Sequence, residues 1–279
     1  RGMSSALHAP PHVLITGGAV RLGAVLCSTF ARAGWKVWCH YQRSADEAHA
    51  LQERLAAEGH TVEPVQADLA DATQRADLIA RLQAAHGPLQ AVVNNASLFE
   101  PDTGDDFTAP LTRRQLEVNL VAPLDLARRM AATHPDDAPA GSCVAIHILD
   151  QKVYNLNPDY FSYTVSKLAL ERAVSLQAQA LAPRARICGV APGLMLVSGP
   201  QSEANFAAAR QANLMRRPLD PADVARACLF LAENPAITGS TLCVDNGQHL
   251  LPLPRDIMFV VDDLLQSHLS HHDLPPKLD

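Results

Sequence analysis

The chain has 279 residues and is 48% hydrophobic, which supports one large α/β domain or two small ones with a proper core and excludes a fibrous or disordered protein. It carries 23 basic and 29 acidic residues, so the net charge of −6 argues against a general attraction to nucleic acids or membranes and leaves a small-molecule role open. No segment stays apolar for the roughly 18 residues that a membrane span needs, and the start of the chain lacks the regions of a secretory signal.

Short runs rich in branched residues alternate with longer amphipathic stretches, which is typical of repeated βα units around a parallel sheet. Residues 1–11 are expected to form an arm that begins with a cloning scar, residues 12–250 one domain, and residues 251–279 a C-terminal extension. Seven strands are expected, at His12–Ile15, Lys36–His40, Val62–Gln66, Ala91–Asn94, Cys143–Leu149, Arg186–Val190 and Thr241–Val244. The pattern predicts an α/β fold, a single doubly wound Rossmann-type domain with a seven-stranded parallel sheet.

Local signals mark helix starts and loops between these strands. Asp220 before Pro221 predicts a capped helix start, and Thr112 with Gln115 resembles a capping box. The least regular internal segments, residues 98–111 and 193–213, follow strands, where the crevice-lining loops of such sheets lie. We expect them to bind substrate.

A glycine-rich loop follows the first strand. The loop runs from Gly17 through Leu22 and Gly23 into an apolar helix, which is the order in which a tight turn presents backbone N–H groups to a pyrophosphate. Gly17 would permit that turn. Gly23 would also allow close helix packing. Arg21 stands where a middle glycine is usual, either as a solvated first-turn residue or as a guanidinium that reaches a cofactor phosphate or an anionic substrate group.

The end of the second strand favours NADP over NAD. NAD sites usually carry an acidic residue about 20 residues past the loop, and this chain has none there. Within the stretch that begins at His40, Arg43 suits the extra 2′-phosphate, and Ser44 either contacts that phosphate or caps the next helix together with the glutamate three residues later. The His40 ring itself is interpreted as strand-end packing more than as a ligand. After the third strand, Asp68 and Leu69 are expected at the adenine, where Asp68 accepts from the amino group or simply forms a turn.

Tyr163 and Lys167 stand four residues apart, so on a helix their side chains share one face. A free phenol has a pKa of about 10, and a tyrosine that donates its proton needs its anion stabilised. The Lys167 ammonium and an oxidised nicotinamide ring would supply that positive field. Asp150, thirteen residues before Tyr163, adds a carboxyl that suits a substrate with more than one proton contact, such as a nitrogen heterocycle; the alternative is a strand-end turn residue.

Taken together, these motifs resemble the short-chain dehydrogenase/reductase family over about residues 13–247. The motifs are the glycine loop, Asn94-Asn95-Ala96-Ser97 after the fourth strand, Asn119 in the next helix, Tyr163 with Lys167, and Pro192-Gly193 after the sixth strand. The resemblance implies an NADP-binding reductase and a homotetramer. It also implies that Tyr163 is the acid, that Lys167 holds the ribose and lowers the tyrosine pKa, and that Asn119 supports a proton-relay water.

Several departures from the common family pattern resemble one branch, the pteridine reductases and the related dihydromonapterin reductases. Arg21 replaces a loop glycine, and Ser97 replaces the glycine usual after Ala96. Asp150 stands where the family normally holds a serine, and it matches the aspartate that in this branch delivers a proton to the pterin together with the tyrosine. Phe99 matches the aromatic that sandwiches a pterin against the nicotinamide, with loop packing as the alternative.

The sequence thus predicts an NADPH-dependent oxidoreductase that transfers hydride to a pterin-type substrate, from dihydropterin to tetrahydropterin, with no metal. The expected substrate-binding residues are Arg21, Ser97, Phe99, Asp150, Tyr163, Leu194 and Met195. One alternative is a carbonyl or quinone reductase, in which Asp150 orients the substrate rather than donating a proton. Another is a non-catalytic NADPH-sensing module, against which the intact pair of Tyr163 and Lys167 argues.

Assembly and location are also predicted. Apolar stretches at residues 168–181 and 222–231 could supply the helix faces of a tetramer, although core packing explains both. In pteridine reductases the chain end of one subunit can close a neighbour's site, and residues 250–256, with Arg255, could do so here. Six cysteines without metal-ligand spacing are interpreted as reduced core residues, which favours the cytoplasm. Three tail histidines are interpreted as solvated rather than metal-binding: His268, His271 and His272.

Overall fold

The computed structural model describes residues 9–197 and 201–268. At its centre is a seven-stranded sheet in the order β3-β2-β1-β4-β5-β6-β7, with every neighbouring pair parallel. The strands are β1 (His12–Ile15), β2 (Lys36–Tyr41), β3 (Val62–Gln66), β4 (Ala91–Asn94), β5 (Cys143–Ile148), β6 (Ala185–Pro192) and β7 (Thr241–Val244). The strand order reverses between β1 and β4, so loops diverge there and leave a crevice at the carboxyl edge of the sheet.

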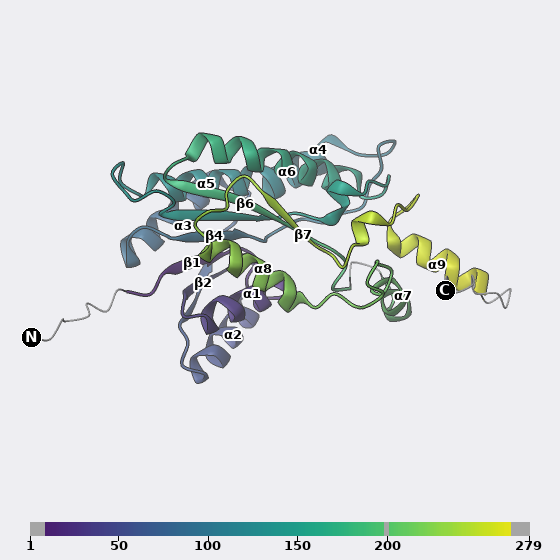
Figure 1. The fold of residues 1–279 in the computed structure, drawn as a ribbon, viewed down its shortest axis with the longest axis horizontal. Helices are drawn as coiled ribbons and strands as arrows, with labels where there is room; N and C mark the ends of the chain where they lie inside the picture. The colour runs from purple at the N-terminus through teal and green to yellow at the C-terminus, as the bar shows by residue number, and fades with distance from the viewer. Residues whose placement is uncertain (1–8, 198–200, 269–279) are drawn as a thin grey trace, which may run out of the picture.

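Helices cover both faces of the sheet (Figure 1). One layer consists of α1 (Arg21–Arg32), α2 (Ala45–Ala57) and α8 (Pro221–Glu233), and the other of α3 (Ala72–His86), α5 (Ala122–Ala132) and α6 (Phe161–Leu181). The shorter elements are α4 (Ala109–Leu116), the π-helical η1 (Glu117–Val121), the 3-10 turns η2 (Gln151–Tyr154) and η3 (Gln248–Leu250), α7 (Glu203–Ala209) and α9 (Ile257–His268).

The predicted doubly wound sheet is confirmed, and its strands match the expected ones within two residues at each end. Every residue of β1, β4, β5 and β6 is buried, because helices cover both faces of these strands. Two apolar cores result. Leu26 and Phe30 of α1 pack on one face, and Leu126 and Met130 of α5 on the other.

Of the three predicted helix caps, one is confirmed and two are wrong. The Asp220 carboxylate caps α8, since it accepts from the N–H of Ala222 at 2.9 Å. In contrast, α4 begins after Thr108, so Thr112 lies inside the helix and the predicted capping box is absent there. Ser44 is the N-cap residue of α2, but its hydroxyl makes no capping hydrogen bond.

The C-terminal extension, whose place the sequence pattern left open, contains α9, which packs beside α7 at the carboxyl edge of the sheet (Figure 1). Helix α7 interrupts the second predicted substrate loop. None of the helices in the described ranges is long and apolar enough to cross a membrane. Of the tail histidines, His271 and His272 lie outside the described residues, as does the arm before residue 9.

Candidate active site

Two neighbouring hollows lie at the carboxyl edge of the sheet. A cavity of about 540 Å³ is bounded by the loops after β1, β4, β5 and β6, and a second of about 850 Å³ lies over the ends of β2 and β3. Gly17 and Val20 of the glycine loop line both. The predicted residues at the first cavity are Gly17, Arg21, Leu22, Asn95, Ala96, Ser97, Phe99, Asp150, Tyr163, Lys167, Pro192, Gly193, Leu194 and Met195. Those at the second are Gly17, His40, Arg43, Ser44 and Asp68.

Three predicted site residues line neither cavity. Leu69 is buried, and its carbonyl accepts from the Arg75 guanidinium at 2.6 Å. Gly23 lies under the loop, where an added Cβ would stand 1.8 Å from the Gly17 carbonyl oxygen. Asn119 is buried behind the first cavity. These residues support the walls rather than form them.

The glycine loop is built to receive an anion. Gly17 has φ +59°, and the close approach of Gly23 lets α1 begin directly against the turn. The N-cap residue of α1, Val20, makes no side-chain capping hydrogen bond, so the first N–H groups of this helix point to the cavity without an internal side-chain acceptor. This end of α1 fits a phosphate.

Arg21 keeps the backbone conformation of the glycine that it replaces. Its φ of +55° is left-handed, which costs a non-glycine residue roughly 1–2 kcal/mol. Its Nη2 donates to the Val197 carbonyl oxygen at 2.6 Å, so the guanidinium ties the loop to the segment after β6. Neither of the two roles expected from the sequence includes this contact between segments.

His40 supports the loop from below. The Gly17 N–H donates to His40 Nδ1 at 3.0 Å, which assigns the proton to Nε2, and Nε2 lies 2.9 Å from the Ala67 carbonyl oxygen. Burial lowers the pKa of His40 to about 4, so the ring is neutral and can accept from Gly17 at physiological pH. His40 thus packs at the strand end and holds the glycine loop by a hydrogen bond, and because it also lines the second cavity, its contact with a cofactor stays a prediction.

At the second cavity, Arg43 is exposed and Ser44 half-buried, and both side chains stand on the wall after β2. The Asp68 carboxylate accepts from the N–H of Ala70 at 3.0 Å, as a turn residue does, and it also lines the cavity. Both roles considered for Asp68 are compatible with this position.

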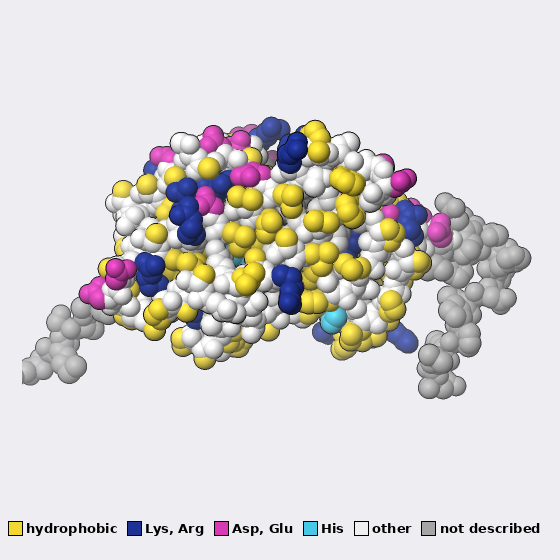
Figure 2. All heavy atoms as spheres, turned by 90° about the horizontal axis from the view of Figure 1, so that it is seen from above, with side chains coloured by type: hydrophobic (Ala, Val, Ile, Leu, Met, Phe, Trp, Pro, Cys, Tyr) yellow, Lys and Arg dark blue, Asp and Glu magenta, His cyan; other side chains and the backbone are white. Residues whose placement is uncertain are grey.

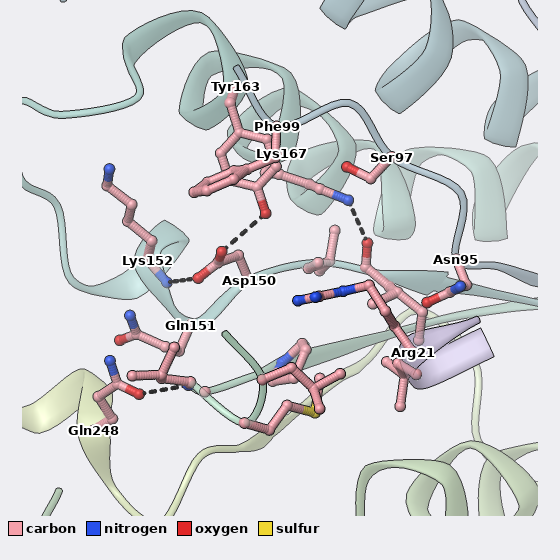
Figure 3. Close-up of a pocket in the computed structure, with 18 of the residues that line it drawn as sticks. Arg21, Asn95, Ser97, Phe99, Asp150, Gln151, Lys152, Tyr163, Lys167 and Gln248 are labelled. Carbon is pink, nitrogen blue, oxygen red and sulfur yellow. Dashed lines mark hydrogen bonds between the residues drawn. The ribbon is translucent and has the colours of Figure 1, made fainter. Parts of the chain in front are cut away.

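The residues predicted to be catalytic meet in the first cavity (Figure 3). The Tyr163 hydroxyl donates to Asp150 Oδ2 at 2.9 Å, while Asp150 Oδ1 accepts from the N–H of Lys152 at 2.9 Å. Asp150 is thus both the cap of η2 and the partner of the phenol. Lys167 Nζ donates to the Ile148 carbonyl oxygen at 2.8 Å and lies 5.8 Å from the Tyr163 ring centroid.

The pKa of Tyr163 is shifted in the opposite direction from the one expected. Burial, followed by the Asp150 carboxylate, raises the pKa of Tyr163 well above its ordinary value, where the sequence led us to expect a lowered one. Burial is the larger cause, and the Asp150 carboxylate adds to it because it disfavours a second negative charge beside it. Burial lowers the pKa of Lys167 to about 8, against the attraction of Asp150. The tyrosine is therefore held in its protonated form.

Phe99 forms an aromatic wall. Its ring stacks on Tyr160 with centroids 4.0 Å apart and 16° between planes, and it meets Tyr163 edge-on at 4.7 Å. The ring remains 37% exposed, so one part of it is open to the cavity. Asn119 holds the same loop, since its Oδ1 accepts from the Leu98 N–H at 2.8 Å and its Nδ2 donates to the Leu98 carbonyl and to Ser166.

Sequence reasoning missed several residues of the first cavity. Gln151 and Lys152 follow Asp150 directly, so their position in the chain could have found them. Gln248 accepts from the N–H of Leu194 at 2.8 Å through its Oε1. Asp256 and Met258 come from the C-terminal extension, and no motif marks them.

The C-terminal segment closes the cavity of its own subunit. Arg255 makes a bidentate ion pair with Asp159 at 2.8–3.0 Å, and the Asp256 N–H donates to the same carboxylate at 2.7 Å. The contact of Arg255 with a neighbouring subunit stays a prediction, and within its own chain Arg255 forms this internal pair. A nearby group of possible metal ligands, Cys243, Asp245 and His249, supports no metal assignment, because the Asp245 oxygens already accept from backbone N–H groups at 2.7–2.9 Å.

A model of the short-chain reductases, described as enoyl-(acyl carrier protein) reductase, matches residues 18–249. This match covers most of the chain and most of the residues that line the two cavities. The chain belongs to the short-chain dehydrogenase/reductase family.

Among individual short-chain reductases, the solved FolM alternative dihydrofolate reductase 1 from Brucella suis, in complex with NADP, is 37% identical. The alignment covers 87% of this chain and 96% of that one, with a TM-score of 0.82. Pteridine reductase 1 of Leishmania tarentolae is 28% identical over 86% of this chain and 96% of its own. Dihydromonapterin reductase of Klebsiella pneumoniae is 24% identical over 86% of this chain and 98% of its own.

Membership of the short-chain reductases assigns a nicotinamide cofactor to this protein. Its geometry fits that group: the open N-terminus of α1 faces both cavities, and Gly193 leaves no room for a side chain, because a Cβ there would lie 2.8 Å from Asp245 Cβ. The predicted resemblance to the pteridine and dihydromonapterin reductases is likewise confirmed at the level of homology.

Proposed function

We propose that this short-chain reductase uses NADPH to reduce a pterin-type substrate from the dihydro to the tetrahydro form. The observation that carries the proposal is the 2.9 Å hydrogen bond between Tyr163 and Asp150, in a cavity that has Phe99 as an aromatic wall. A carboxyl and a phenol together suit a ring nitrogen that takes up a proton, and an aromatic face suits a flat ring. The homology to pterin reductases supports the same substrate class.

The residues that line the second cavity support a preference for NADP over NAD. Arg43 and Ser44 would contact the 2′-phosphate, the open end of α1 the pyrophosphate, and Lys167 the nicotinamide ribose. NADP in the related Brucella structure supports this assignment. Leu22, Asn95, Ala96, Ser97, Pro192 and Gly193 would complete the cofactor-binding walls of the first cavity.

NADPH, when bound, supplies a hydride. The chain supplies the proton and its control. Tyr163 holds one proton at its phenol oxygen, which it donates to Asp150 before substrate binds. The phenol would then turn this proton to the ring nitrogen and deliver it there, so that the hydrogen bond to Asp150 is given up in this step. The Lys167 ammonium opposes the negative charge left on the pair. Arg21, Leu194 and Met195 would border the ring, and Asn119 would act by fixing the loop that carries Phe99.

A carbonyl or quinone reductase is the second candidate. Leu194, Met195 and Met258 give the first cavity an apolar wall, which would suit a less polar substrate than a pterin. In that enzyme the Tyr163–Lys167 pair would act alone and Asp150 would only orient the substrate.

The two candidates differ in their dependence on Asp150. NADPH oxidation is followed by absorbance with dihydrobiopterin, dihydromonapterin, dihydrofolate and a simple quinone, for the wild type and Asp150→Ser. We expect the rate of pterin reduction to be at least about 100-fold lower in the variant, which is within the range that general acid catalysis contributes. Turnover of the quinone alone, equal in both proteins, would replace the pterin proposal with the carbonyl or quinone one.

We also propose a homotetramer in the cytoplasm. Hydrophobic side chains gather along the face seen in Figure 2, which is the side of the α5 and α6 layer. On α6, Leu176 is 67% exposed, and on α8 of the other layer Phe230 is 53% exposed, so each helical layer presents a large apolar side chain that a subunit interface would cover. The compartment rests on the six unpaired cysteines, five of them buried.

A further inference from the structure

Residues 98–100 form a wall that the two cavities share. Leu98 and Glu100 line the second cavity, whereas Phe99 between them lines the first. Side chains that point alternately to opposite sides are typical of extended chain. These three residues belong to no strand of the sheet, so their backbone N–H and C=O groups need hydrogen-bond partners from elsewhere.

Two amide side chains supply these partners. Asn119 Oδ1 accepts from the Leu98 N–H at 2.8 Å, and Asn119 Nδ2 donates to the Leu98 carbonyl oxygen at 2.9 Å. Four residues earlier, Gln115 Oε1 accepts from the Glu100 N–H at 3.3 Å, and its Nε2 donates to the Glu100 carbonyl oxygen at 3.4 Å. Each amide thus binds both backbone polar groups of one residue, as a neighbouring strand would.

The same two amides also bind the helix that carries the predicted catalytic residues. Gln115 Nε2 donates to Ser162 Oγ at 2.6 Å, and Asn119 Nδ2 donates to Ser166 Oγ at 3.1 Å. On α6 these serines directly precede the predicted catalytic tyrosine and lysine. Two parallel rungs result, and each runs from a backbone residue of the loop through an amide to a serine of α6.

The serine hydroxyls fix the direction of these hydrogen bonds. The Ser162 hydroxyl donates to the Asp102 carboxylate, whose other oxygen accepts from the Ser162 N–H at 2.8 Å. The Ser166 hydroxyl donates to the Tyr163 carbonyl oxygen at 2.5 Å. Because a hydroxyl has one proton, each serine can only accept from its amide, and this determines the orientation of both amides.

The side chains of both rungs are buried. Gln115, Ser162 and Ser166 are fully buried, and Asn119 is 1% exposed. A buried polar group that loses its partner cannot turn to water instead, so a fully paired network of this kind favours one arrangement of the chain. The rungs therefore hold the loop in one register against α6.

We propose that Gln115 is a positioning residue of the reductase: its rung, together with that of Asn119, holds Phe99 at its place beside Tyr163. The Phe99 ring meets the Tyr163 ring edge-on at 4.7 Å (Figure 3). The family resemblance assigns a role to Asn119 and none to Gln115. The effect on substrate rests on the proposed function, whereas the rungs themselves do not depend on which ring is reduced.

Hydrogen exchange followed by NMR on the free protein tests the rungs without a substrate. The variant is Gln115→Met, which keeps an unbranched side chain of similar length and removes its hydrogen bonds. The control is Gln83→Met, the same change at an exposed position of α3. We expect the Glu100 amide to exchange at least about 10-fold faster in Gln115→Met and at the wild-type rate in the control.

A second variant cuts the same rung at its other end. Ser162→Ala is a smaller change in volume, and it should also accelerate exchange of the Glu100 amide. An unchanged rate for this amide in both folded variants would overturn the proposal.

Kinetics with dihydrobiopterin and NADPH test the effect on the site. Because Phe99 would border the substrate ring, we expect Gln115→Met to raise KM for the pterin about 10-fold and to change kcat by less than about 3-fold. Adding Gln115→Met to Phe99→Leu should change KM by less than about 2-fold, since both substitutions remove the same contact. Two effects on KM that multiply would show that Gln115 does not act through Phe99.

The proposed function and the positioning role fail in different ways. If the wild type reduces dihydrobiopterin but Gln115→Met keeps the wild-type KM, the positioning role is wrong and the proposed function stands. If the wild type reduces no dihydropterin, the proposed function is wrong, and the exchange rate of the Glu100 amide decides whether Gln115 holds the loop.

Discussion

At the scale of single residues, the site depends on side chains with two hydrogen-bonding duties. Asp150 caps η2 with one oxygen and accepts from the Tyr163 hydroxyl with the other, so a turn residue also contacts the predicted catalytic tyrosine. His40 similarly joins Gly17 of the phosphate loop to Ala67 after β3. Each of these residues makes one hydrogen bond that holds the backbone and one that holds another part of the site. The effect of a substitution on stability or on activity therefore depends on which hydrogen bond it removes.

His40 predicts how stability depends on pH. Its pKa of about 4 in the folded protein lies below its ordinary value of 6.5, so the unfolded chain binds the extra proton between these values. The contribution of neutral His40 to the free energy of unfolding is complete above pH 6.5. It falls by about 3 kcal/mol as the pH decreases to about 4. We expect His40→Gln to flatten the decrease in unfolding free energy between about pH 7 and about pH 5.

Urea unfolding at several pH values measures this effect. The control is His49→Gln, at an exposed position of α2, which should keep the wild-type pH dependence. Buried His147, whose pKa burial also lowers to about 4, adds a similar dependence that persists in both variants. A His40→Gln protein with the same slope as the wild type would show that His40 is not held neutral.

At the scale of elements, the contact of α1 with the glycine loop shapes the predicted cofactor site. At Gly23 any side chain would clash with the Gly17 carbonyl oxygen. The absence of a side chain lets the N-terminus of α1 lie against the loop, where its N–H groups are open to an anion. The π-helical turn η1 has a comparable function on the substrate side, because it carries Asn119, which grips both backbone polar groups of Leu98. The helical elements α1 and η1 therefore each fix the backbone of the loop next to them.

Gly23→Ala should disrupt the loop. The added Cβ would lie 1.8 Å from the Gly17 carbonyl oxygen, so α1 and the turn must separate. We expect NADPH to bind at least about 10-fold more weakly by fluorescence titration, together with a loss of roughly 1–3 kcal/mol in stability. The matched control is Gly104→Ala, whose Cβ would make an ordinary 3.6 Å contact with Phe161, and it should bind NADPH like the wild type.

At the scale of the whole molecule, one sheet carries two cavities on its carboxyl edge, and the chain ends by returning to the first of them. The pair of Asp159 and Arg255 joins residues 96 apart in sequence and fixes this return. Apolar surface remains on both helical layers, at Leu176 and at Phe230. The C-terminal segment of the same chain lines the first cavity, and the two apolar faces are the ones that the proposed assembly would cover.

Leu176→Glu tests the assembly. A charge on the exposed face of α6 would be buried without a partner in a subunit interface, at a cost of several kcal/mol. We therefore expect light scattering to give a tetramer for the wild type and a smaller species for this variant. Ala57→Glu, at an exposed position of α2, is the control and should stay tetrameric. An unchanged mass for Leu176→Glu would remove this face from the proposed interface.

Local patterns in the sequence determined the sheet, the order of its strands along the chain and most of the residues around the cavities. Hydrophobic runs fixed the strands within two residues, and the spacing of Tyr163 and Lys167 placed both on one helix face. These features depend on neighbours in the chain or on a helical turn, so they can be read without a fold. Family resemblance added Asp150 and Phe99.

Only the tertiary structure decided the contacts between distant segments. Asp256 reaches the cavity because Asp159 binds Arg255, and no periodicity relates these residues. The raised pKa of Tyr163 and the lowered pKa of His40 likewise follow from burial, which is a property of the packed molecule. A sequence pattern records which side chains are available, whereas desolvation and long-range hydrogen bonds exist only once the chain has folded around them.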